Sequence, residues 1–197
     1  SPVEVRNDAS ELDDAVQDLE TQIQENASKI LGTPESEAFR DLFSRMGYPD
    51  QTPAGERLVN IVKDNGLNRH NNIVDAYNIA SAEYGAGLGM HNAGKVDGDV
   101  VVRRASGSER IQPMFKDDYK QPKQGDLIYS VDDQLLALLG HIDVDSERFK
   151  VTASTDQVLL LALGNHETSE EYNREICERA FELISLTTPD ATIKFLE

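Results

Sequence analysis

Several residue types and patterns are missing from this chain of 197 residues. It has no tryptophan and a single cysteine, Cys177, which excludes an internal disulfide and any paired-cysteine metal motif. No apolar run approaches the roughly 18 residues of a membrane-spanning helix, and the first residues are polar and acidic where a signal peptide is basic and then apolar. We therefore expect a cytoplasmic protein without membrane contact, in which Cys177 is a buried structural thiol.

Familiar catalytic signatures are missing as well. There is no glycine-rich loop followed by Lys and Ser or Thr, no GxSxG elbow and no HExxH helix, so nucleotide hydrolysis, a lipase-type triad and zinc proteolysis lose their main support. The glycines at 85–89 make no dinucleotide fingerprint, because that motif follows a strand and opens a helix. None of the four histidines pairs with another ligand type at helical spacing, so we expect no metal and no cofactor.

Positive charge is scarce. The chain has 19 Lys and Arg against 36 Asp and Glu, which gives a formal net charge of −17. Such a surface repels phosphate backbones, although a high-salt cytoplasm also selects acidic surfaces. Six basic residues nevertheless cluster in the middle of the chain: Arg103, Arg104, Arg110, Lys116, Lys120 and Lys123. The cluster is either a local patch that meets nucleic acid or the solvated end of a strand and its loop.

Helical patterning dominates the first half of the chain. Apolar residues recur near helical spacing over the first 30 residues and leave one apolar stripe on an otherwise exposed helix, with Ser10 as its cap. Three further helices are predicted at 34–46, 53–65 and 71–84, each followed by a glycine. We expect residues 1–32 to form an amphipathic arm on which a second copy, giving a homodimer, or a protein partner docks.

Short β-branched runs follow residue 85. The predicted strands are 99–104, 126–131, 134–142 and 157–163, with a hairpin turn at Asp132 and Asp133 and a last short strand at 191–196. A capping box of Thr168 and Glu171 opens a long helix to about Ser185. This order predicts an α+β fold, a mixed-sheet single domain over residues 33–197 with an added N-terminal helix.

The stretch "NNIVDAYN" carries Asn72, Asp75 and Asn78 at steps of three within an otherwise apolar helix. Residues three apart share one helix face, so these side chains form a polar row. The row is either a capping and buried hydrogen-bond network or the floor of a site. A buried carboxylate such as Asp75 needs donors nearby in either case.

Two histidines are candidate catalytic groups. His91 lies just beyond the glycines at 85–89, and His141 ends a strand-like run beside Asp143. Histidine is suited to proton transfer near neutral pH, and a neighbouring carboxylate can orient its ring. The alternative for each is a surface or hydrogen-bonded histidine at a strand end.

The run from Asn71 to Ala105 resembles the editing domain of the phenylalanyl-tRNA synthetase beta chain. The shared features are a Val-Asp pair, an Asn, a Glu-x-Gly and an acidic strand ending in Arg, matched here by Val74 and Asp75, Asn78, Glu83 to Gly85, and "DGDVVVR". The free-standing relatives of that domain, the B3/4 domain proteins, are closer still. This chain resembles them from about residue 36 onward, through "NNIVDAYN", "PKQGD" and "DSERFKVT".

This resemblance implies a B3/4-type fold and a tRNA or aminoacyl-tRNA partner. In the synthetase, a Thr-Asn pair lines a pocket where a tyrosine wrongly attached to the tRNA for phenylalanine is hydrolysed off; Tyr77 and Asn78 match that pair. The substrate-binding candidates are Asn72, Asp75, Tyr77, Asn78, Gly89, Asp143, Thr152 and Thr155. The tRNA-binding candidates are Arg103, Arg104 and Lys123.

The chain also departs from the family pattern. The site histidine of the synthetase falls on Gly89, and its strand glutamate falls on Leu161. His91 shares a face with Gly89 if the segment is extended, so its ring can refill that space. Free-standing relatives carry tryptophans and an arginine around His141 and Asp143, so we expect a remodelled pocket.

Two functions remain open at this point. The first is a trans-acting deacylase that hydrolyses the aminoacyl ester of mischarged tRNA, for which an amino-acid pocket, an oriented water and oxyanion donors suffice. His91 and His141 are then the catalytic candidates. The second is a non-catalytic module that binds a free amino acid or another small metabolite, which the acidic surface and the altered site positions favour.

Overall fold

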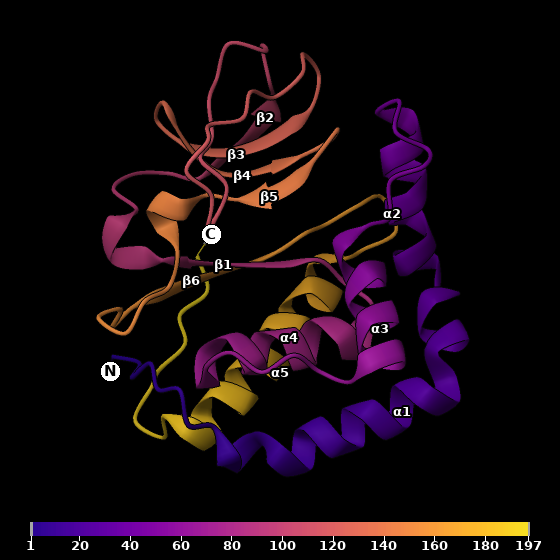
Figure 1. The fold of residues 1–197 in the computed structure, drawn as a ribbon, viewed down its shortest axis with the longest axis vertical. Helices are drawn as coiled ribbons and strands as arrows, with labels where there is room; N and C mark the ends of the chain where they lie inside the picture. The colour runs from indigo at the N-terminus through magenta and orange to yellow at the C-terminus, as the bar shows by residue number, and fades with distance from the viewer. Residues whose placement is uncertain (1, 197) are drawn as a thin grey trace.

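The structure is a computed structural model that describes residues 2–196, and these form three layers (Figure 1). A four-stranded sheet, a two-stranded ribbon and a layer of helices follow one another across the molecule. The helices are α1 (Asp13–Leu31), α2 (Pro34–Arg45), α3 (Ala54–Asn65), α4 (Asn72–Tyr84) and α5 (Glu170–Thr187). The strands are β1 (Leu88–Asn92), β2 (Val101–Arg104), β3 (Leu127–Val131), β4 (Gln134–Leu139), β5 (Asp143–Asp145) and β6 (Val158–Ala162). The predicted α+β single domain with an N-terminal helix is confirmed.

The described strands form two antiparallel sheets in place of the predicted mixed sheet. The larger sheet has the order β2-β3-β4-β5. Its central pair is joined by the predicted hairpin, in which Asp132 takes a left-handed conformation (φ 49°) that short polar residues tolerate. In the two-stranded ribbon, β1 pairs with β6 and Gly89 lies opposite Leu161. The two positions at which the chain departs from the synthetase pattern are therefore cross-strand partners.

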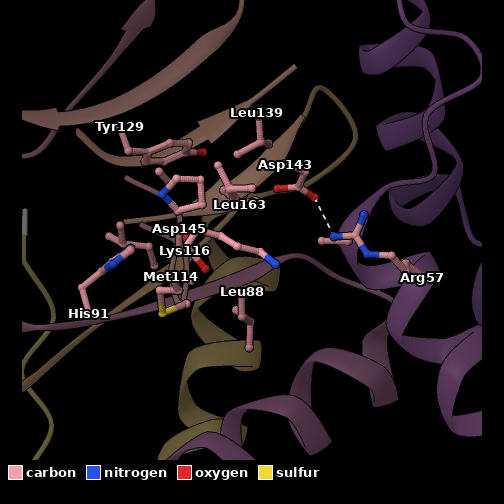
Figure 2. Close-up of a pocket in the computed structure, with 16 residues that line it drawn as sticks. Arg57, Leu88, His91, Met114, Lys116, Tyr129, Leu139, Asp143, Asp145 and Leu163 are labelled. Atoms are coloured by element: carbon pink, nitrogen blue, oxygen red, sulfur yellow. Dashed lines mark hydrogen bonds and ion pairs between the residues drawn. The ribbon is translucent and has the colours of Figure 1, made fainter. Parts of the chain in front are cut away.

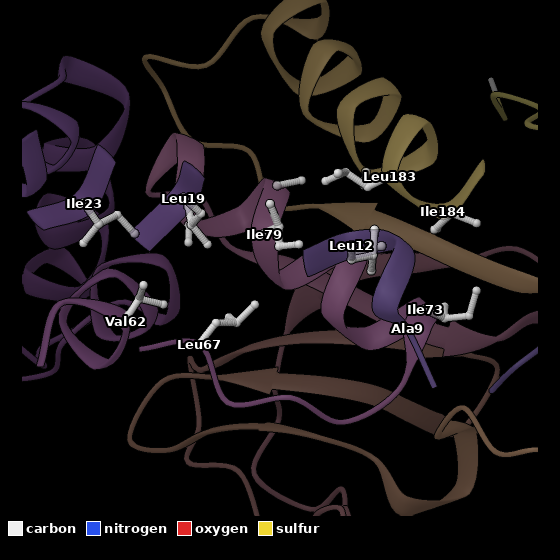
Figure 3. Packing of buried hydrophobic residues seen from close by; sticks show 14 of the residues in the cluster. Ala9, Leu12, Leu19, Ile23, Val62, Leu67, Ile73, Ile79, Leu183 and Ile184 are labelled. Atoms are coloured by element: carbon white, nitrogen blue, oxygen red, sulfur yellow. The ribbon is translucent and has the colours of Figure 1, made fainter. Parts of the chain in front are cut away.

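The main hydrophobic core lies among the helices (Figure 3). Leu19 of α1, Ile79 of α4 and Leu183 of α5 are each at most 1% exposed. Burial of such a side chain contributes roughly 1.5–3 kcal/mol, so this cluster is the main stabilising unit of the fold. Two smaller clusters involve the strands of the larger sheet and their neighbours. The cavity described below lies between the larger sheet and the β1–β6 ribbon.

Helix α1 is part of that core. Its apolar stripe, Leu19, Ile23, Ala27 and Ile30, is buried within the chain itself, and the helix packs against α3 and α4. Because this stripe packs against other helices of the same chain, it is not open to a second copy. A homodimer through the N-terminal helix therefore stays a prediction. No helix within residues 2–196 is long and apolar enough to span a membrane.

Local capping signals explain the ends of α2 and α4. The Thr33 side chain accepts a hydrogen bond from the amide of Ser36, and Asn71 accepts from two amides in the first turn of α4. Helix α4 ends at Gly85, whose left-handed conformation (φ 61°) costs glycine little. These signals are why the predicted bounds of both helices agree closely with the structure.

Two capping predictions were wrong. Ser10 opens a short 3-10 turn before α1, and its side chain caps neither element. Ser169 caps α5 by accepting from the amide of Tyr172. Thr168 instead accepts from the amide of Asn165, so its hydroxyl closes the preceding turn.

The strand predictions failed at three places. Residues 191–196 form no strand, and β5 was not predicted. The segment Leu88–Asn92, which has no β-branched residue, forms β1 because its backbone pairs with β6. These outcomes depend on which partner strand the fold brings alongside, and short windows of sequence do not contain that information.

Candidate functional site

A cavity of about 320 Å³ lies between the two sheets, beside the start of α3 (Figure 2). Figure 2 shows Tyr129 and Leu139 entering from the larger sheet and Arg57 from the helical side, while the Leu88 side chain points from β1 toward the helices. Most of the wall is apolar and includes Leu88, Met114, Leu139, Val144, Leu161 and Leu163. Apolar walls with a few convergent polar groups are typical of small-molecule sites.

Strand β5 brings two carboxylates to this cavity. Asp143 and Asp145 lie two residues apart on the strand, so both face the same side. Arg57 of α3 donates to Asp143, with Nη2 and Oδ2 separated by 3.1 Å. The Asp145 carboxylate has no such partner among residues 2–196. One carboxylate is therefore held by a cation, and the other is free to contact a ligand.

The surroundings of these carboxylates raise their pKa values. Burial, followed by the neighbouring charge of Asp143, raises the pKa of Asp145 to about 7. Burial also raises the pKa of Asp143, but the Arg57 guanidinium opposes that shift. At neutral pH Asp145 thus exchanges a proton readily, as groups in catalytic sites often do. Burial and the charge of Asp143 also raise the pKa of Tyr129 to about 12, so this phenol stays neutral.

His91 of β1 forms the wall beside Gly89. Its side chain is 1% exposed, and its Nε2 atom has no hydrogen-bond partner within the described chain. Burial lowers the pKa of His91 to about 4, so the ring is neutral at pH 7. A Cβ atom added to Gly89 would lie 3.3 Å from Nε2. The ring therefore borders the space beside Gly89, as the shared strand face predicted.

The loop that carries Met114 and Lys116 closes another side of the cavity. The amide of Met114 donates to the carbonyl of Asp145 at 2.9 Å, which ties the loop to β5. Next to them Phe115 is 81% exposed and takes a left-handed conformation (φ 61°). The Glu147 carboxylate holds that conformation by accepting from the Phe115 amide at 2.8 Å. A large aromatic side chain is thus held in solvent at the cavity rim.

Two members of the predicted polar row of α4, Asn72 and Asp75, lie in a hydrogen-bond network away from the cavity. Asn72 accepts from the Arg6 amide and donates to the Glu4 carbonyl and the Thr187 hydroxyl. Asp75 accepts from Arg69 Nε and from the amide of His70. Neither residue lines the cavity, and both bind the start of α4 to neighbouring segments. The network alternative therefore describes these two residues.

The other substrate-binding candidates, Tyr77, Asn78, Thr152 and Thr155, do not line the cavity. Tyr77 is packed against the helical core, and burial and the charge of Asp145 raise the pKa of its phenol. Asn78 is half-buried on the same helix. Thr155 accepts from the Asn92 side chain at 3.0 Å and from the Thr152 amide at 2.9 Å. Of the substrate-binding candidates, Gly89 and Asp143 line the cavity itself.

The second catalytic candidate, His141, lies outside the cavity wall. Its Nδ1 atom is 2.7 Å from Asp126, a carboxylate with no exposed surface. Asp126 also accepts from the Tyr48 hydroxyl at 2.7 Å and from the Lys123 amide at 2.8 Å. This network joins the α2–α3 connection to the larger sheet. The prediction that a carboxylate orients His141 fits this geometry with Asp126, whereas Asp143 turns toward the cavity.

The three tRNA-binding candidates contact other parts of the chain. Arg103 forms an ion pair with Glu109 at 2.6 Å, and Arg104 donates to the carbonyl of Gly125. The Lys123 ammonium lies 5.7 Å from the centre of the Tyr48 ring. Their charges remain on the surface, but each side chain is partly fixed.

Three polar residues of the cavity were not identified from the sequence at all: Asp145, Arg57 and Tyr129. A signal existed for Asp145, because alternation along "DVD" places it on the same strand face as Asp143. No signal existed for Arg57, which lies 86 positions before its partner Asp143. No group of three or more His, Cys, Asp or Glu side chains within residues 2–196 is placed to hold a metal ion.

Comparison with known families identifies the class of this protein. A family model of the B3/4 domain matches residues 40–181, which is most of the chain. The protein therefore belongs to the B3/4 domain family. No curated protein matches the chain.

Proposed function

We propose that this B3/4 protein is a trans-acting hydrolase that removes an amino acid from the 3′ end of tRNA. The observation that carries the proposal is the cavity itself, in which carboxylates, a neutral imidazole and apolar walls converge. An aminoacyl group needs an acceptor for its α-ammonium and an apolar space for its side chain. The Oδ1 atom of Asp143, which Arg57 does not use, supplies the first, and the walls formed by Leu139, Leu161 and Leu163 supply the second. The cytoplasm is the location that we propose for this reaction.

The rim of the cavity suits the nucleotide end of the substrate. Arg57 and Lys116 line the cavity, and both are exposed. Phe115 precedes Lys116 in the same loop and has the Lys150 ammonium 5.2 Å from its ring centre. Further along that loop, the exposed Tyr119 ring has the Arg110 guanidinium 4.8 Å from its centre. Single-stranded nucleotides bind by stacking their bases on aromatic side chains and placing phosphates near cations. We assign the terminal nucleotide of tRNA to this rim, where local positive charge offsets the net charge of −17.

The experiment is the release of labelled amino acids from a panel of correctly charged and mischarged aminoacyl-tRNAs, at low and high salt. The wild-type protein is compared with Ala137→Trp, which fills the cavity from β4 opposite Asp145, and with Lys29→Gln, a surface control at a different hollow. We expect selective release by the wild type and the control, and loss of release in Ala137→Trp. No release above the buffer rate by the wild-type protein at either salt concentration contradicts the proposal.

A second candidate is a module that binds a free amino acid without chemistry. The observation that favours it is the lack of a nucleophile, since the described cavity wall contains no Ser, Thr or Cys. Calorimetric titration with single amino acids tests this alternative. Micromolar binding together with no ester hydrolysis favours the module. Hydrolysis of the ester without binding of the free amino acid favours the enzyme.

A further inference from the structure

Gly89, His91 and Asp145 face one small space at the cavity wall. A Cβ atom built on Gly89 would lie 3.3 Å from His91 Nε2 and 3.9 Å from Asp145 Oδ1, and beyond its chain neighbours it would meet no other atom within 4 Å. The cavity continues over the α-carbon of Gly89, where the missing side chain leaves room and a methyl group would be in tight contact with His91 Nε2. An imidazole nitrogen and a carboxylate oxygen border that room from different strands.

Neither of these two atoms is engaged elsewhere within residues 2–196. His91 Nε2 is buried without a partner, although a buried polar atom of this kind usually has one. The Asp145 carboxylate makes no hydrogen bond or ion pair, whereas Asp143 on the same strand face is held by Arg57. The cavity therefore contains one donor or acceptor nitrogen and one proton acceptor that folding alone does not use.

We propose that this space holds the hydrolytic water, which Asp145 deprotonates while His91 Nε2 orients it. The inference rests on the proposed aminoacyl ester hydrolysis. As the water oxygen bonds to the ester carbonyl carbon, one water proton passes to the Asp145 carboxylate. When the bond from that carbon to the ribose oxygen breaks, Asp145 returns the proton to the ribose oxygen. The products are a free amino acid and a tRNA with its terminal hydroxyl restored, and Asp145 is again a carboxylate.

Electrostatics agree with these roles. A general base is most effective when its pKa lies near the working pH, and the pKa of Asp145 is raised to about 7. The groups that face it are Asp143 on its own strand, Tyr77 from α4 and His91 from β1. Burial keeps His91 neutral by lowering its pKa to about 4, so the imidazole does not compete for the proton. Two cations of the same cavity, Arg57 and Lys116, complete the charged surroundings.

Three variants separate the water site from substrate binding. Gly89→Ala fills the room with a methyl group at a backbone position that accepts alanine; Asp145→Asn removes the base; Asp145→Glu keeps a carboxylate. Single-turnover hydrolysis is measured across pH 5 to 9 with the aminoacyl-tRNA that the wild-type protein releases fastest. Binding is measured separately with 3′-aminoacylamino-adenosine, whose amide link resists hydrolysis.

We expect Gly89→Ala and Asp145→Asn to bind the amide analogue within about threefold of wild type, and to lose roughly 100-fold or more in rate. The wild-type rate should rise with pH to a plateau above about 7, Asp145→Asn should lose that inflection, and Asp145→Glu should regain part of the rate. If Asp145→Asn keeps the wild-type rate and pH profile, the proposed water site is wrong and the proposed function still stands. No hydrolysis by the wild-type protein overturns this inference together with the proposed function.

Discussion

Buried polar groups are treated differently in the helical layer and in the cavity. At the start of α4, Asn72 and Asp75 have every expected partner, from the Arg6 amide to the Arg69 guanidinium. On the cavity wall, His91 Nε2 is buried without a hydrogen-bond partner within the described chain. The Asp145 carboxylate is also buried there, close to the charge of Asp143. The first arrangement stabilises the fold. The second costs stability, and such costs are typical of sites that bind or transform a ligand.

The comparison also separates two groups of residues that the sequence presents alike. Asn72, Asp75 and His91 are polar residues with apolar neighbours in the sequence, and Asp145 follows Val144. Hydrogen-bond satisfaction distinguishes them: removing a satisfied group should destabilise the protein, and removing an unsatisfied group should stabilise it. Three changes, from the largest expected effect to the smallest, test this division, and a fourth tests the cavity rim.

Asn72→Ala should cause the largest loss of stability. It removes three hydrogen bonds, to Arg6, Glu4 and Thr187, and the half-buried Arg6 amide loses its acceptor, while the Thr187 hydroxyl keeps the carbonyl of Ile184. We expect the free energy of unfolding to fall by about 3 kcal/mol, measured by urea denaturation at pH 7. A loss below about 1 kcal/mol means that this network contributes little to the fold.

Asp145→Asn should stabilise the protein at alkaline pH. The raised pKa means that the folded state keeps a proton between pH 4 and 7 that the unfolded state has lost, so wild-type stability from this group falls as pH rises through that range. The variant lacks this loss and should gain about 2 kcal/mol at pH 8, with the gain fading toward pH 4. Asp143→Asn is the matched control, because it removes the ion pair with Arg57 and should not give the same gain. Equal behaviour of the two variants would argue against an unpaired Asp145.

His91→Phe should give a smaller gain of about 1 kcal/mol at pH 7, because a ring of similar shape replaces an unpartnered nitrogen. The depressed pKa of His91 means that the unfolded state takes up a proton between pH 6.5 and 4 that the folded state does not. Wild-type stability from this group therefore falls as pH falls, and the advantage of the variant should grow in that range. Chemical denaturation at pH 7 and pH 5 measures both effects; a destabilised variant would indicate that Nε2 has an unseen partner.

Phe115→Asn should change stability least, by less than about 0.5 kcal/mol, because the side chain is exposed and asparagine tolerates the left-handed conformation. If the ring stacks on a nucleotide, the affinity for tRNA should fall by about tenfold, which corresponds to one base stack. Filter binding at fixed salt measures this change. Tyr119→Asn tests the second exposed ring, and unchanged affinity in both variants would remove the rim from the tRNA interface.

Much of the fold could be predicted from the sequence, whereas less of the candidate site could. The Thr33 and Asn71 caps, Gly85 and the Asp132–Asp133 hairpin are local features, and the elements they define were predicted. Strand β1 was missed because its conformation depends on a partner about 70 residues later.

The cavity depends on the same kind of long-range placement. His91, Gly89 and Asp143 were named from the sequence and do line the wall. His141 was paired with the nearest carboxylate in the sequence, whereas the fold gives it Asp126, 15 positions earlier. Spacing along a strand indicates which face a side chain shares, but it does not indicate what the opposite element brings to that face.

The most direct test of this account compares single-turnover release of amino acid from aminoacyl-tRNA by Asp145→Asn and Thr187→Val at pH 7.5. Thr187 belongs to the satisfied network through its bond to Asn72 and lies outside the cavity. The account predicts that Thr187→Val keeps the wild-type rate despite lower stability, while the more stable Asp145→Asn loses roughly 100-fold. Equal rates for Asp145→Asn and the wild-type protein would contradict it.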